Sequence, residues 1–108
     1  DEHATCYIVQ GRGLVVISSC GHSGIINTVK SAMATANVDK VHAVIGGFHL
    51  GTSPQEYLQH TLRELERINP DVILPMHCTG EAFIAMLREK MPEKVVYSNV
   101  GSRFTFGA

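Results

Sequence analysis

The chain has 108 residues, of which 44% are hydrophobic and 18% charged, and its formal net charge is −1 at pH 7. This length suits one domain, and the absence of a basic run argues against nucleic acid or an anionic membrane as a partner. No signal-peptide pattern and no bilayer-length apolar run are present, so we expect a cytoplasmic protein.

The first predicted elements are a β-hairpin and a helix. β-Rich runs at residues 5–10 and 14–17 flank a glycine-containing turn of hairpin length. From residue 23 to residue 36 the apolar side chains recur at helical spacing, and Ser23 is placed to cap the first turn.

Strands and helices then alternate. A β-branched run at 41–45 precedes Ser53-Pro54-Gln55-Glu56, which has the pattern of a capping box, and the helix that starts there ends before Pro70. A strand at 71–74 and a helix at 80–91 follow, with Thr79 as the expected cap. Two closing strands are predicted at 94–97 and 103–106.

This order, β-β-α-β-α-β-α-β-β, defines the fold class. Strands that alternate with helices of this length indicate an α/β domain over residues 1–108, with three helices packed on a mixed, partly parallel sheet. An odd number of cysteines, three, fits reduced thiols or metal ligands better than a disulfide framework.

Three strand ends carry one histidine each: VVISSCGHSG, AVIGGFHLG and VILPMHCTG contain His22, His49 and His77. The carboxyl ends of parallel strands share one rim of a sheet, where ligands bind, so we expect these histidines to converge. Imidazole is a common ligand of zinc and iron. Gly46 and Gly47 would let the backbone approach a ligand, although they also suit a tight turn.

The stretch SSCGHSG leaves other chemistries open. Ser23 stands in a near match to the GHSxG nucleophile elbow, although the last glycine is replaced by Ile25. Cys20 could act as a nucleophile with a histidine base. Two cysteines and two histidines could also form a structural zinc site, although the usual CxxC spacing is missing. That set is Cys20, His22, His77 and Cys78.

The blocks "CGH", "GGFHL" and "HCTG", in this order, resemble the C-terminal half of the metallo-β-lactamase superfamily. The most similar branch is the ribofuranosylaminobenzene phosphate synthase-like proteins of pterin metabolism, and phosphorylcholine esterases are more distant. The resemblance covers nearly the whole chain. It implies half of an αββα sandwich and a metal-dependent hydrolase that acts on a phosphate ester or a pterin-related small molecule through a metal-bound hydroxide.

The resemblance also implies roles for individual residues. His22 and His77 match metal ligands, with zinc as the usual metal and iron or manganese as alternatives. His49 matches a further rim histidine with a catalytic role, such as polarising a phosphate. The expected substrate-binding positions are Gly46, Gly47 and Thr79. Two thiols, Cys20 and Cys78, would lie beside the ligands or replace them.

Two departures from the family affect the expected activity. The family's HxHxDH signature, which supplies most ligands of the first metal, does not occur in these residues, and Cys20-Gly21-His22 stands where many members carry a bridging carboxylate. We therefore expect the isolated chain to be inactive and to need an N-terminal half-domain or a second copy. The alternative is a non-catalytic fragment or subunit.

Overall fold

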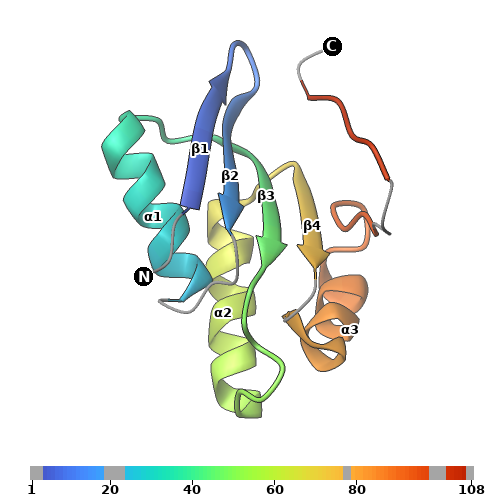
Figure 1. Ribbon diagram of the computed structural model, residues 1–108. Helices are drawn as coiled ribbons and strands as arrows, with labels where there is room; N and C mark the ends of the chain where they lie inside the picture. The colour runs from blue at the N-terminus through green and yellow to red at the C-terminus, as the bar shows by residue number, and fades with distance from the viewer. Residues whose placement is uncertain (1–3, 19–23, 77–78, 98–101, 107–108) are drawn as a thin grey trace.

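The computed structural model describes residues 4–18, 24–76, 79–97 and 102–106. Within these ranges the chain forms four strands and three helices, a β-hairpin followed by helices and strands in alternation (Figure 1). The elements are β1 (Ala4–Val9), β2 (Gly13–Ser18), α1 (Ile25–Ala36), β3 (Val41–Gly47), α2 (Gln55–Ile68), β4 (Val72–Met76) and α3 (Glu81–Lys90).

The four strands form one mixed sheet in the order β1-β2-β3-β4. β1 and β2 pair antiparallel as a hairpin, whereas β2 with β3 and β3 with β4 pair parallel. Each parallel pair is joined through a helix, as parallel neighbours require. The predicted α/β class with a mixed sheet and three helices is therefore confirmed.

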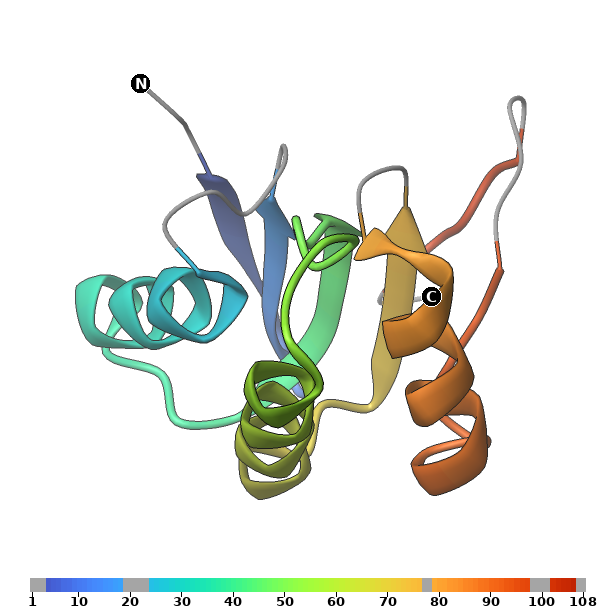
Figure 2. The same ribbon diagram turned by 90° about the horizontal axis from the view of Figure 1, so that it is seen from below.

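All three helices cover the same face of the sheet (Figure 2). The predicted apolar face of α2 is buried there, with Leu58, Leu62 and Leu65 at most 6% exposed. Burying one such side chain contributes about 2 kcal/mol to stability. They pack with buried residues of the sheet such as Val16 and Val44. Among the described residues, no helix has the length and apolar character needed to cross a bilayer.

The two closing strands are a wrong prediction for the described residues. Residues 94–96 approach β4 through one isolated bridge, Ile73 with Val95, and residues 102–106 form no strand. Ile73 N–H donates to Lys94 O at 2.7 Å, and Val96 N–H donates to Ile73 O at 2.9 Å. These bonds involve a single residue of β4, so the segment does not extend into a ladder.

The helix caps of the described residues differ from the predicted ones. The N-cap of α1 is Gly24, and Ser23, the predicted cap, lies outside the described residues. In α2 the N-cap is Pro54, with no side-chain cap hydrogen bond, so Ser53 does not form a capping box. The N-cap of α3 is Gly80 rather than Thr79.

Candidate functional site

The carboxyl ends of β2, β3 and β4 meet at one rim of the sheet. In the parallel register Ser18 lies opposite Gly46, and Gly47 lies opposite Met76. Adjacent strands are about 4.8 Å apart, so the chain leaves β2 and β4 about 10 Å from each other, with the end of β3 between them. The three strands thus end at one rim, as the sequence predicted, whereas the convergence of the histidines stays a prediction, because His22 and His77 lie outside the described residues.

Of the predicted metal ligands and their neighbours, four residues lie outside the described residues. They are Cys20, His22, His77 and Cys78. Their segments start directly after Ser18 and Met76, on either side of the end of β3. The described ranges contain no group of three or more His, Cys, Asp or Glu side chains that could hold a metal ion. The donor types of the four residues, imidazole and thiol, are those that zinc prefers.

His49 is the rim histidine that falls within the described residues, and its backbone is strained. Its φ of 52° lies in the left-handed region, which non-glycine residues rarely adopt. The side chain is exposed, while its neighbours Phe48 and Leu50 are 1% and 3% exposed. His49 is therefore an exposed residue with a costly backbone conformation between two buried neighbours, a combination that is common at functional sites.

Gly46 is required by the packing of the rim. Its φ is 121°, and a Cβ built on it would lie 1.8 Å from Ser18 O. The Ser18 hydroxyl in turn donates to Gly47 O at 3.1 Å. The close approach of β2 and β3 at this point accounts for Gly46 without a ligand, and the predicted substrate contact of Gly46 and Gly47 stays a prediction.

Thr79 is fully buried, with 0% exposure, and its hydroxyl is used twice. The hydroxyl donates to Met76 O at 2.7 Å and accepts from Phe48 N–H at 3.2 Å. This pairing explains why Thr79 does not cap α3. The hydroxyl connects the end of β4 to the turn that carries His49, and the predicted substrate contact of Thr79 stays a prediction.

A second polar cluster lies at the opposite end of the sheet. Asp71 accepts from Lys40 Nζ at 2.7 Å and pairs with His42 Nδ1 at 2.8 Å. Hydrogen bonds from Lys40 first, and from His42 second, lower the pKa of the Asp71 carboxyl. The His42 ring also meets Phe106 edge-on, with centroids 5.8 Å apart. This cluster joins the amino ends of the strands to the C-terminal segment, as expected of a structural histidine.

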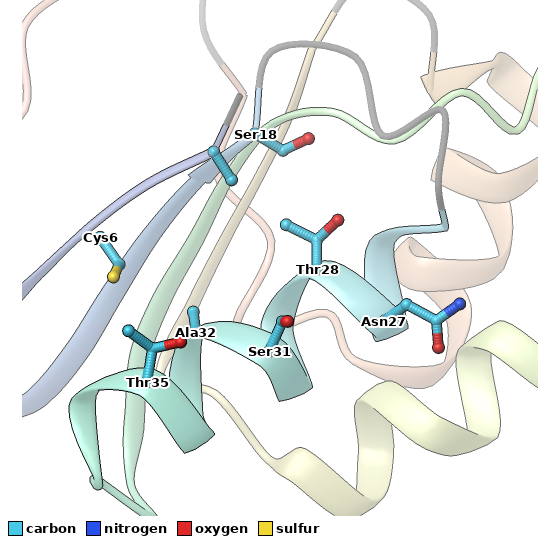
Figure 3. Close-up of a pocket in the computed structure, with 8 residues that line it drawn as sticks. Cys6, Ser18, Asn27, Thr28, Ser31, Ala32 and Thr35 are labelled. Carbon is cyan, nitrogen blue, oxygen red and sulfur yellow. The ribbon is translucent and has the colours of Figure 1, made fainter. Parts of the chain in front are cut away.

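Sequence reasoning did not find a surface hollow of about 380 Å³ between the hairpin and α1 (Figure 3). Cys6 and Ser18 of the sheet lie opposite Ser31 and Thr35 of α1. Small polar residues at helical spacing on α1 were the available signal. The described lining contains no imidazole and no charged side chain. Its residues are Ala4, Cys6, Ser18, Asn27, Thr28, Ser31, Ala32 and Thr35.

No family model matches the chain, but individual known proteins are similar to it. It is 34% identical over 99 residues to the 7,8-dihydropterin-6-methyl-4-(β-D-ribofuranosyl)-aminobenzene-5′-phosphate synthase of Methanocaldococcus jannaschii, covering 92% of this chain and 34% of that protein. It is also 34% identical over 87 residues to an uncharacterised protein of the same organism, covering 81% of this chain and 32% of that protein.

A solved structure has the same fold. It is a metal-dependent hydrolase of the β-lactamase superfamily, which matches with a TM-score of 0.87 and 26% identity. The match covers 94% of this chain and 39% of the hydrolase. The chain thus spans about a third of the length of the curated relatives that it matches.

Proposed function

We propose that the chain, which shares its fold with a metal-dependent hydrolase of the β-lactamase superfamily, contributes one part of a metal-dependent hydrolase site, at the rim where β2, β3 and β4 end. The observation that carries this proposal is the register of the parallel strands. In this register the strands that precede His22, His49 and His77 in the sequence end at neighbouring positions. The fold match to a metal-dependent hydrolase supports the same reaction class.

In this proposal His22 and His77 hold a divalent metal through neutral imidazoles. We propose zinc as the metal, because zinc binds both imidazole and thiolate ligands. Cys20 is close to His22 in the sequence, and Cys78 directly follows His77. A bound zinc ion would supply Lewis acidity and lower the pKa of a coordinated water toward about 7.

His49 would act on the substrate rather than on the metal. His49 is exposed and its backbone lies between two buried residues, so its imidazole would donate a hydrogen bond to an anionic oxygen of the substrate. A phosphate ester of a small molecule fits this chemistry, and the pterin-pathway relative favours a pterin-related phosphate. The glycines at 46 and 47 would shape the backbone that leads to His49.

The site would be completed by groups beyond these 108 residues. The relatives are longer than the region of similarity. A tetrahedral metal has four coordination positions, of which two imidazoles fill only two, so other donors must fill the rest. We propose that a further half-domain or a second copy supplies them, and that the chain alone binds zinc weakly and is inactive. A subunit with no catalytic role is the second candidate.

Titration of the chain with Zn²⁺ by calorimetry tests the proposal. H22A and H77A should each weaken zinc binding at least about tenfold, a loss of about 1.4 kcal/mol. H60A is the matched control, because His60 is exposed on α2, away from the rim. Equal zinc affinity of all four proteins would rule out the proposed ligands, and tight one-to-one binding by the chain alone would refute the incomplete site.

A further inference from the structure

The turn that carries His49 is tied to β4 through one side chain. Phe48 N–H, one residue before His49, donates to Thr79 Oγ1 at 3.2 Å. The same hydroxyl donates to Met76 O at 2.7 Å, at the last residue of β4. The buried Thr79 hydroxyl therefore links the Phe48 segment to its own segment, 31 residues later in the sequence.

The backbone beyond Phe48 rests on the start of α3. A Cβ built on Gly80 would lie 2.5 Å from Gly51 Cα, so the two segments approach as closely as backbone allows. Phe48 and Leu50 are buried on either side of His49. The position of the His49 backbone is consequently set by contacts to residues 79 and 80, and the hydroxyl of Thr79 supplies the directional part of those contacts.

We propose that Thr79 is a positioning residue for His49. Its hydroxyl holds the left-handed turn at a fixed place relative to the end of β4, from which His77 follows. The inference rests on the proposed function, because the place of His49 relative to the end of β4 matters only if His49 acts on a substrate at this rim. It differs from the role of substrate ligand that the sequence suggested for Thr79.

A hydroxyl is required at this position because it accepts one bond and donates another. Valine has nearly the same shape but neither capacity, so T79V leaves Phe48 N–H and Met76 O without their partner in a buried place. Serine retains the hydroxyl and removes one methyl group. Thr61 of α2 is also buried, at 2% exposure, and lies outside the rim, so T61V controls for the loss of a buried hydroxyl in general.

Amide hydrogen exchange and the NMR signals of the His49 ring test the positioning directly. We expect the Phe48 amide to exchange at least about tenfold faster in T79V and the His49 ring signals to shift, with T79S close to wild type. T61V should leave both readouts unchanged even if it lowers overall stability. The affinity of the zinc-loaded chain for inorganic phosphate should fall at least about tenfold in T79V and recover in T79S.

Three results would overturn the inference. They are an unchanged Phe48 amide and His49 ring in T79V, a T79S that behaves like T79V, or the same changes in T61V. If T79V does not fold, hydrogen exchange of the wild-type protein tests the inference, because a Phe48 amide that is not protected from exchange would also overturn the inference. A wild-type chain that binds neither zinc nor phosphate would refute the proposed function, whereas the exchange data would still decide whether Thr79 positions His49.

Discussion

The strained backbone of His49 predicts a reversal in the usual order of alanine and glycine. At φ of 52° an L-residue pays about 1–2 kcal/mol for the left-handed conformation, and glycine avoids this cost. Glycine, however, loses more backbone entropy on folding than alanine does, which offsets about 0.5–1 kcal/mol of this stabilisation. We therefore expect H49G to be more stable than H49A by about 1 kcal/mol. Both variants lack the imidazole, so the comparison isolates the backbone.

His60 provides the matched control, since it is an exposed histidine in the regular helix α2. There glycine should be less stable than alanine by about 1 kcal/mol, so the two positions differ by about 2 kcal/mol with opposite signs.

Urea denaturation of H49G, H49A, H60G and H60A measures the free energies of unfolding, and each kcal/mol corresponds to a shift in Tm of about 4–8 °C. If glycine destabilises both positions equally, His49 is not strained. The conformation of His49 would then carry no cost that a function has to justify.

Three further variants test other parts of the fold. G46A should lose about 3 kcal/mol, because its methyl group would meet Ser18 O, whereas G11A, with φ of 79° but open space around it, should lose only about 1 kcal/mol; equal losses would contradict the packing argument. The pKa of Asp71 is lower in the folded state than in the unfolded state, so its ionised carboxylate stabilises the fold at pH values above the unfolded-state pKa of about 3.9. This stabilisation is lost as the pH falls through the folded-state pKa. The stability difference between wild type and D71N should therefore shrink below about pH 4 in denaturation curves, and a constant difference would exclude the ion pair as its source. L65A should cost about 2–5 kcal/mol, since Leu65 is 0% exposed, and a loss under 1 kcal/mol would show that the site is not core.

Hydrophobic pattern predicted the layers of this fold well, because burial depends on periodicity. The spacing of Leu58, Leu62 and Leu65 sets the inner face of α2 whatever it packs against. The shared rim followed from strand order alone, since parallel strands joined through helices must end on the same side. These features need no knowledge of individual contacts.

Hydrogen bonds between distant segments could not be predicted in this way. Thr79 has the residue type and place of a helix cap, but its hydroxyl is taken by Met76 and Phe48, a pairing that exists only once β3 and β4 are assembled. The closing segment at 94–97 has strand propensity, but pairing there stops at Ile73. The left-handed backbone of His49 likewise has no signal in its own sequence, because glycine or asparagine is the usual residue there.

The central claim is that histidines from the strand ends hold a metal at the rim. X-ray absorption at the zinc edge of the zinc-loaded chain measures this most directly, because Zn–N distances of about 2.0–2.1 Å are distinct from Zn–S distances near 2.3 Å. We predict a shell of nitrogen and oxygen with the scattering pattern of two imidazoles, reduced to one in H22A and in H77A. A shell dominated by sulfur, or imidazole scattering that is unchanged in both variants, would contradict the account.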